Sequence, residues 1–161
     1  MLIEIYSDNL NKKDISKNLH RSARAIIVVD NQVLLLHTKT LDYFMLPGGG
    51  IKENETPELS VIREIKEETG YFGEIIKKTV IIKEFFPEAT WETHYFLVKI
   101  DKNKFTSVKF TEEEKMQDLH QKWFKVDEAL ILLDNHESNF KNAYNIMQRE
   151  FIALINSKEK G

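Results

Sequence analysis

The chain has 161 residues, 42% of them hydrophobic and 30% charged, which is the composition of a globular protein rather than a disordered or fibrous one. Its 23 Lys and Arg against 26 Asp and Glu give a net charge of −3, which disfavours non-specific binding to nucleic acid. Because the chain has no cysteine and no long apolar run, disulfides, thiol catalysis and Cys-bound zinc are excluded, and we expect a cytoplasmic protein without a membrane span.

The first half of the chain predicts a β-hairpin. Residues 1–20 give no clear pattern, and the polar segment Asn9–Asn18 is expected to be a loop or a mobile arm. The runs Ala23–Val29 and Gln32–His37 are rich in apolar and β-branched residues. They flank Asp30-Asn31, a pair that tolerates the left-handed backbone of a tight hairpin turn.

A glycine-rich segment, Pro47–Gly50, leads into a predicted helix over residues 57–69. Successive glycines let the backbone bend and approach groups that side chains would exclude, so we expect a loop there. Thr56 is a good N-cap, Pro57 suits the first helical position, and Gly70 suits a left-handed C-cap.

The second half mixes strands and helices. Its alternating pattern predicts strands over Ile75–Phe86, Trp91–Ile100 and Lys122–Val126, the first two paired antiparallel, and then a short helix over Asp127–Leu133. A C-terminal helix follows, and its predicted apolar face consists of Phe140, Ala143, Tyr144, Met147, Phe151, Leu154 and Ile155. This order predicts one domain over residues 1–161 with an α+β fold or an α/β/α sandwich.

Three glutamates of the predicted helix over residues 57–69 carry the strongest chemical signal. Glu64, Glu67 and Glu68 fall within an arc of about 100° on one face, opposite Val61 and Ile65. Like charges at this spacing repel each other, and a divalent cation would remove the repulsion. Oxygen ligands without cysteine favour Mg²⁺ or Mn²⁺, although a solvated acidic helix face is the more usual explanation of three glutamates alone.

The combination of the glycine segment with this helix is more specific. Arg63 lies four residues before Glu67, where its guanidinium can brace a carboxylate. The full pattern consists of Gly49, Glu55, Arg63, Glu64, Ile65, Glu67, Glu68 and Gly70. It resembles the box of the Nudix hydrolase family, which includes MutT-like enzymes, over residues 49–71. The chain departs from the usual pattern at Tyr71, where an aliphatic residue is common, and at Lys52, where relatives often carry Glu.

The resemblance implies an α/β/α sandwich of the Nudix type, with a mixed sheet between helices, and a metal site. The ligands that it implies for Mg²⁺ (or Mn²⁺) are Glu64, Glu67, Glu68 and the backbone carbonyl of Gly48. One of the three glutamates would deprotonate the attacking water. Arg63 would act with them in catalysis by orienting the cluster, together with Glu55.

The activity implied by the resemblance is Mg²⁺-dependent hydrolysis of a nucleoside diphosphate linked to another group. The substrate would be a nucleotide-type small molecule: a dNTP, a dinucleoside polyphosphate, a nucleotide sugar or an RNA 5′ end. The alternative is a non-catalytic nucleotide-binding or regulatory module, which would be expected to have lost box glutamates. An isoprenoid diphosphate isomerase would need a cysteine that this chain lacks.

Further candidates lie outside the box, and nothing in the sequence indicates an oligomeric state. Relatives in the family commonly have one more acidic ligand, and Glu112, Glu113 and Glu114 supply candidates in a predicted loop; a solvated loop or the start of a helix is the alternative. Phe44, Lys39 and Arg24 are candidates for contact with substrate, against core packing for the first and a solvated surface for the other two.

Overall fold

The computed structural model describes residues 1–8 and 10–158. Asn9, the first residue of the predicted arm, and residues 159–161, the end of the predicted domain, lie outside the described residues. The strands are β1 (Leu2–Tyr6), β2 (Leu19–Val29), β3 (Gln32–Thr38), β4 (Tyr43–Met45), β5 (Gly48–Gly50), β6 (Glu74–Phe85), β7 (Thr90–Lys99) and β8 (Leu119–Lys125). The helices are the 3₁₀ turn η1 (Lys12–Asp14), α1 (Pro57–Thr69), α2 (Glu112–Gln117), α3 (Val126–Asn135) and α4 (Ala143–Lys158).

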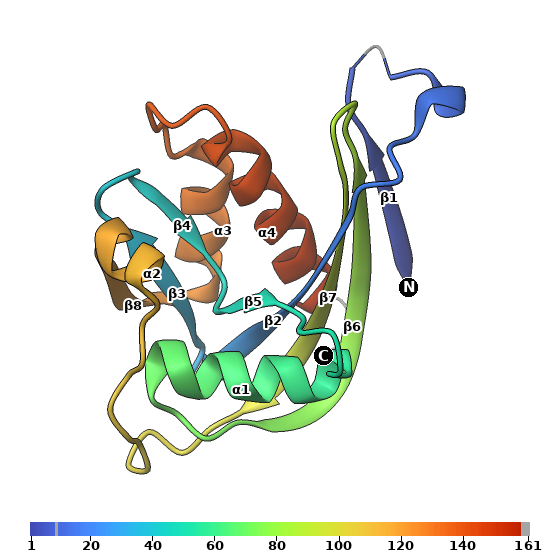
Figure 1. Cartoon of the computed structure of the whole chain (residues 1–161). Coiled ribbons are helices and arrows are strands. Elements are labelled where there is room, and N and C mark those ends of the chain that lie inside the picture. Colours follow the sequence, from blue (N-terminus) through green and yellow to red (C-terminus); the bar gives the residue numbers. More distant parts are fainter. Residues whose placement is uncertain (9, 159–161) are drawn as a thin grey trace.

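The strands form a mixed sheet. Its order is β1-β6-β7-β2-β3-β4, and β5 pairs with β2 while β8 pairs with β3. The pairs β1–β6 and β2–β7 are parallel, and the remaining pairs are antiparallel. Figure 1 shows β6 and β7 as a long curved hairpin that crosses the molecule. The predicted mixed sheet and α+β class are confirmed.

Helices cover both faces of the sheet because its central strands are apolar on both sides. Ile26 of β2 belongs to the hydrophobic cluster that contains α3 and α4 residues, whereas its neighbours Ala25 and Ile27 belong to the cluster of α1. Alternation with a period of two sends neighbouring side chains to opposite faces. Figure 1 accordingly shows α1 on one side of the strands and α3 with α4 on the other, as in the predicted α/β/α sandwich.

The predicted hairpin is confirmed. β2 and β3 pair antiparallel, and the turn residues Asp30 and Asn31 have φ of 50° and 62°. Left-handed backbone at both central positions matches the twist of the flanking strands, which is why Asp and Asn suit this turn.

The glycine segment differs from its prediction as a loop. Gly48–Gly50 forms the short strand β5, which pairs antiparallel with β2 in the register Arg24↔Gly48. A Cβ on Gly48, whose φ is 151°, would lie 2.2 Å from the backbone oxygen of Ala23. The prediction of a loop was therefore wrong, because the missing side chains let this segment approach β2 closely enough to pair with it.

The C-terminal helix begins later than predicted. α4 starts at Ala143, so Phe140 precedes it, although its ring still packs on the core. Tyr144 is 69% exposed. The prediction was wrong for Phe140 and Tyr144, because the buried stripe runs through Ala143, Met147 and Leu154, and Tyr144 lies about 100° away from it.

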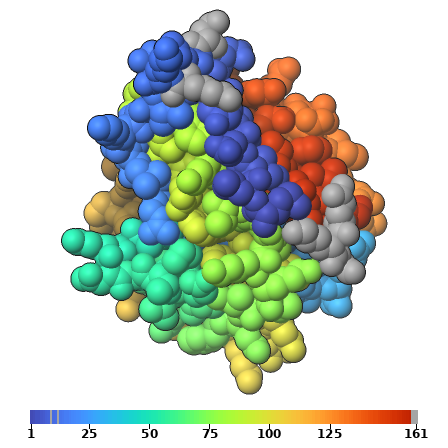
Figure 2. All heavy atoms as spheres, turned by 90° about the vertical axis from the view of Figure 1, so that its right-hand side faces the viewer, coloured from blue at the N-terminus to red at the C-terminus, as the bar shows by residue number. Residues whose placement is uncertain are grey.

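Smaller differences concern the ends of elements and the first 20 residues. β8 begins at Leu119 rather than Lys122, and α3 continues to Asn135. β1 pairs with β6, and Figure 2 shows it on the surface at this edge of the sheet. Among the described residues, no helix is both long and apolar enough to cross a membrane.

Candidate functional site

Helix α1 presents the predicted carboxylates from a well-capped position. The Thr56 side chain accepts a hydrogen bond from the Leu59 N–H at 3.2 Å, Pro57 begins the helix, and Gly70 ends it with φ 80°. These caps fix both ends, as the sequence predicts. Val61 and Ile65 pack against the apolar residues of β2, which leaves the acidic face toward β5.

Two of these carboxylates meet a third from α2. Oxygen atoms of Glu64, Glu68 and Glu114 all lie within 4.8 Å of one another. Glu112 and Glu113 are exposed and lie outside this group. The segment is a helix rather than the predicted loop, because the Thr111 side chain and the Glu114 carboxylate form a capping box, with bonds of 3.1 Å and 2.9 Å.

The group is costly without a counter-ion. Glu68 is 1% exposed and accepts a hydrogen bond from the Gly48 N–H at 2.8 Å. Burial raises the pKa of the Glu68 carboxyl well above its usual value, and the charge of Glu64 raises it further. Burial also raises the pKa of Glu64, against the lowering effect of Arg63. A divalent cation would reverse these shifts, so the three carboxylates are suited to bind one.

Arg63 binds the carboxylates around this group. Its Nε and Nη2 donate to the two oxygens of Glu55 at 2.6 Å and 2.9 Å, a bidentate pair. Its Nη1 donates to Glu64 at 3.0 Å and to Glu67 at 3.1 Å, and its Nη2 also donates to the Gly50 carbonyl at 3.1 Å. The bonds from Arg63 hold the pKa of Glu55 at about 2. Arg63 and Glu55, the two residues predicted to orient the glutamates, are therefore in direct contact.

Two of the predicted metal ligands, Glu67 and the Gly48 carbonyl, do not belong to the group of oxygen atoms formed by Glu64, Glu68 and Glu114. Glu67 contacts Arg63 and is not in the group that contains Glu64 and Glu68. Gly48 contacts that group through its N–H. The roles of Glu67 and of the Gly48 carbonyl as metal ligands stay predictions.

The backbone of β5 passes directly under the carboxylates. A Cβ on Gly49 would lie 2.6 Å from Oε1 of Glu64, whereas a Cβ on Gly50 would meet nothing within 4 Å. A side chain at position 49 would therefore displace the Glu64 carboxylate, whereas a side chain at position 50 would displace nothing.

A cavity of about 410 Å³ lies between strands of the sheet and α4. Arg24, which pairs with Gly48 in the sheet, belongs to its wall. Its other aromatic and charged lining residues include Tyr43, Glu84, Phe86, Trp91 and Arg149, and Asn142 and Asn145 add two amides. Aromatic faces beside arginines and amides suit a nucleoside, which offers a flat ring and polar edges.

The other two residues predicted to contact substrate lie elsewhere. Phe44 is buried in the core, where its ring stacks on His37 at 4.3 Å between centroids. Lys39 is exposed at the end of β3, where its N–H donates to the carbonyl of Asp118 at 3.2 Å. Neither lines the cavity.

A buried network of charges lies beside this cavity and was missed by the sequence analysis. Arg149 and Glu150 of α4 are 7% and 0% exposed, and Arg149 contacts Glu84 at 3.5 Å. One signal was available: Glu150 lies seven residues after Ala143, on the apolar stripe of the helix, where a charge needs a buried partner.

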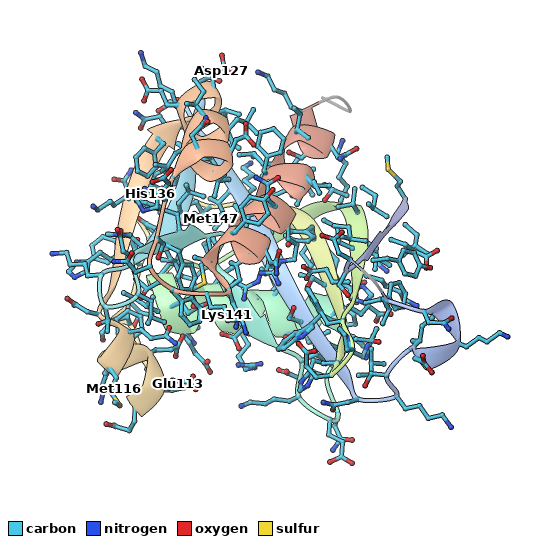
Figure 3. All side chains as sticks on the ribbon, turned by 90° about the horizontal axis from the view of Figure 1, so that it is seen from above. Glu113, Met116, Asp127, His136, Lys141 and Met147 are labelled. Atoms are coloured by element: carbon cyan, nitrogen blue, oxygen red, sulfur yellow. The ribbon has the colours of Figure 1, made fainter. Side chains whose placement is uncertain are left out.

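A second hollow, of about 890 Å³, lies between the β3–β4 turn and the segment that enters α4. His136, Lys141 and Met147, labelled in Figure 3, line it. The His136 ring contacts the carboxylate of Asp42 at 3.1 Å. The wall of this hollow contains none of the box residues.

The model of the NUDIX domain matches residues 19–145. The chain belongs to the Nudix family. Its box accounts for the glycine segment, helix α1 and the glutamates described above, so the resemblance predicted from residues 49–71 is confirmed and extends over most of the chain.

Other Nudix proteins are similar to parts of the chain. The ADP-ribose pyrophosphatase of Methanocaldococcus jannaschii is 39% identical over 74 residues, which are 41% of this chain and 44% of that protein. The match therefore spans less than half of that relative's length. The 8-oxo-dGTP diphosphatase of Proteus vulgaris is 31% identical over 99 residues, 58% of this chain and 87% of that protein.

Solved Nudix structures share the fold. A UDP-X diphosphatase has a TM-score of 0.63 at 18% identity, covering 92% of this chain and 67% of its own. The MutT protein of Bacillus halodurans has a TM-score of 0.57 at 24% identity, covering 70% and 72%. At these identities the similarity establishes the fold alone.

Proposed function

We propose that this Nudix protein hydrolyses a nucleoside diphosphate linked to another group, in a reaction that depends on Mg²⁺ or Mn²⁺. The observation that carries the proposal is the meeting of Glu64, Glu68 and Glu114 within 4.8 Å beside Arg63. The similarity to proteins named ADP-ribose pyrophosphatase and 8-oxo-dGTP diphosphatase supports cleavage of a pyrophosphate bond.

The donor set fits a hard divalent cation. Its ligands would be the carboxylates of Glu64, Glu68 and Glu114, with Glu67 and the Gly48 carbonyl as further candidates. All are oxygen donors, and the buried Glu68 gains a partner that offsets the cost of its charge. When bound, Mg²⁺ supplies charge neutralisation at the diphosphate and a lower pKa for a water.

The side chains have separate tasks in this proposal. A box glutamate accepts the proton of the attacking water, and Arg63 keeps Glu64 and Glu67 in place through its 3.0 Å and 3.1 Å bonds. Arg24 and the aromatic wall of the 410 Å³ cavity bind the nucleoside part. The diphosphate then lies between this cavity and the carboxylates, because Arg24 pairs with Gly48, whose N–H reaches Glu68.

The alternative of a non-catalytic binding module is less well supported. A regulatory relative is expected to lose box glutamates, whereas here Glu64 and Glu68 are present and lie close to a further carboxylate. A module that only binds nucleotide would gain nothing from three carboxylates packed beside a polyanion.

The test is a panel of substrates with the purified protein. It contains a dNTP and an oxidised dNTP, a dinucleoside polyphosphate, ADP-ribose and a 5′-triphosphorylated RNA, each with Mg²⁺, with Mn²⁺ and with excess EDTA. Nucleoside monophosphate, pyrophosphate and phosphate are measured separately. We expect turnover of at least one member that requires the cation. Turnover that survives EDTA contradicts the metal dependence, and binding without turnover across the panel favours the regulatory module.

A further inference from the structure

The buried carboxylate of Glu150 reaches from α4 to the backbone that precedes β5. Its Oε1 accepts the N–H of Leu46 at 3.3 Å, and its Oε2 accepts the hydroxyl of Tyr95 at 2.5 Å. Arg149 donates to Oε1 at 3.3 Å, and Nε of Arg24 lies 3.6 Å from the same oxygen. Two arginines and two hydrogen-bond donors thus surround a carboxylate that is 0% exposed.

The same ion pair also holds the other polar group of Leu46. Nη1 of Arg24 donates to the Leu46 carbonyl at 2.8 Å, while Glu150 accepts the Leu46 N–H. Arg24 belongs to β2 and Glu150 to α4, so a strand and a helix both form hydrogen bonds with the backbone of Leu46. Leu46 itself is 0% exposed, and no solvent can replace either bond.

The position of Leu46 matters because the metal site begins two residues later. Pro47 follows and has no N–H, and its carbonyl accepts the N–H of Ala25 at 2.8 Å. The next N–H, that of Gly48, donates to Glu68. In this stretch the Leu46 N–H, two residues before Gly48, is the backbone donor that a side chain of α4 accepts.

We propose that Glu150 is a positioning residue for the metal site: by fixing Leu46 it sets where Gly48 meets Glu68. The inference rests on the proposed function, because it requires that Glu68 and its neighbours bind a divalent cation. It assigns to α4 a task that the box itself does not contain. The arrangement of the carboxylates around the ion then depends on the length of the Glu150 side chain, and not only on its charge.

Two conservative substitutions separate the effect of the length of the Glu150 side chain from the effect of its charge. Glu150→Asp keeps the charge between the arginines but withdraws the carboxylate by one methylene, about 1.5 Å, from Leu46. Glu150→Gln keeps the length and an acceptor for the Leu46 N–H but loses the charge. We expect Glu150→Asp to weaken the binding of Mn²⁺ alone about five- to tenfold, near the lower end of the effects typical of groups that orient metal ligands. Glu150→Gln should change it less than about twofold.

Mn²⁺ binding is followed by the electron paramagnetic resonance signal of the free ion, without substrate, at a temperature where circular dichroism shows each variant folded. Glu84→Asp and Glu84→Gln are the matched controls, because Glu84 is a buried carboxylate on the same Arg149 but has no contact with Leu46. We expect both to keep Mn²⁺ affinity within about twofold of the wild type, the same limit as for Glu150→Gln. Glu150→Gln should have the lower melting temperature of the two Glu150 variants, since it removes a buried carboxylate from beside Arg24 and Arg149.

The reverse order, with Glu150→Gln weaker in Mn²⁺ binding than Glu150→Asp, overturns the inference and shows that Glu150 acts by charge alone. Equal losses in the Glu84 variants overturn it as well. Glu68→Gln distinguishes the two proposals: if it weakens Mn²⁺ binding while both Glu150 variants bind normally, the metal site stands and only the positioning role fails. If the wild-type protein binds no Mn²⁺, both proposals fail.

Discussion

One guanidinium holds three of the glutamates around the candidate metal site. Arg63 forms a bidentate pair with Glu55 and single bonds with Glu64 and Glu67, and it lies on the same helix as the last two. A planar group with five donors can bind these carboxylates at fixed angles, whereas the ammonium of a lysine has no preferred plane. The hydrogen bonds from Arg63 lower the pKa of Glu55 to about 2, so the Glu55 carboxylate stays ionised and paired with Arg63 at neutral pH.

Arg63→Lys should therefore lower kcat, with KM changing less than about threefold, because the lost bonds serve the transition state more than substrate binding. Apparent Mg²⁺ affinity should weaken about 10- to 100-fold. Steady-state kinetics at several Mg²⁺ concentrations measure both. Arg21→Lys, at an exposed ion pair with Glu92, is the control and should leave kcat and Mg²⁺ dependence near wild type. A large rise in KM at unchanged kcat would instead place Arg63 on the substrate phosphate.

The neighbouring glutamates Glu113 and Glu114 of α2 allow a second test, because only Glu114 belongs to the group of three carboxylates. Glu114→Gln removes a charge from the carboxylate group but keeps the capping box, since Gln serves equally well at that position. We expect kcat to fall about 10²-fold at subsaturating Mg²⁺ and to recover in part as Mg²⁺ is raised.

Glu113→Gln is the matched control for this comparison. Glu113 is exposed and lies outside the group of three carboxylates, so it should tolerate the change with kcat within about twofold. Equal effects of Glu113→Gln and Glu114→Gln on Mg²⁺ dependence would remove Glu114 from the site.

At the scale of elements, β5 is the strand on which the site depends most. It lies between β2 and α1, and each of its first two glycines faces an atom that would collide with a side chain. The strand is three residues long and is held by pairing with β2 on one side and by Glu68 on the other. The hydrogen bond to Glu68 and the close approach to Glu64 link the position of β5 to the carboxylates of α1.

Two alanine substitutions in β5 test this dependence. Gly49→Ala places a methyl 2.6 Å from the Glu64 carboxylate and should lower kcat at least about tenfold, because the carboxylate must move. Gly50→Ala meets nothing and should keep kcat within about twofold. Both are checked by kinetics at saturating Mg²⁺, with thermal unfolding to confirm the fold. If Gly50→Ala is the more damaging, the close contact at Gly49 does not govern activity.

The sequence predicted the elements that local residues determine and missed those set by distant partners. The hairpin around Asp30-Asn31 and helix α1 from Pro57 to Thr69 follow from turn and cap residues near them, and both are confirmed. The pairing of β5 with β2 depends on a strand more than 20 positions away, since Gly48 pairs with Arg24. A run of glycines does not indicate which strand it pairs with, so a loop was predicted there.

The candidate site was predictable to a similar extent. The box indicated Glu64, Glu68 and Arg63, but Glu112, Glu113 and Glu114 were equivalent in sequence. Glu114 differs from the other two only because the packing of α2 brings its carboxylate close to Glu64 and Glu68. The contact of Glu150 with Leu46 joins residues 104 positions apart, and no local pattern predicts such a partner.

Across the whole molecule, a second carboxylate ties three strands together. Glu92 of β7 accepts hydrogen bonds from Arg21 of β2 and from His94, both at 2.9 Å, and Lys83 of β6 lies 3.5 Å away. Burial alone would raise its pKa, but the two hydrogen bonds outweigh burial and hold the pKa at about 2. A carboxylate with a lowered pKa stabilises the fold above its unfolded pKa, and this contribution is lost as the pH falls toward the folded value.

Glu92→Gln should lower the free energy of unfolding at pH 7 by about 2 kcal/mol, a figure reduced from the full shift to allow for partial solvent screening. The difference from wild type should shrink between pH 4.5 and pH 2, and urea unfolding at pH 7, 4 and 2.5 measures it. Glu74→Gln, at an exposed site on β6, should match wild type at each pH. A difference for Glu92→Gln that is independent of pH would assign the effect to packing.

The parallel pairing of β2 with β7 also constrains how the chain folds as it leaves a ribosome. Arg21 and its partner Glu92 are 71 positions apart, so β2 emerges long before the strand beside it exists. At about 5 to 20 residues per second, the interval is about 4 to 14 seconds, during which the β2–β3 hairpin has one unpaired apolar edge. Trp91, whose ring stacks on His20 at 4.3 Å, gives this step an optical reporter: its fluorescence should change when nascent chains are long enough for the whole of β7 to leave the ribosome and pair with β2.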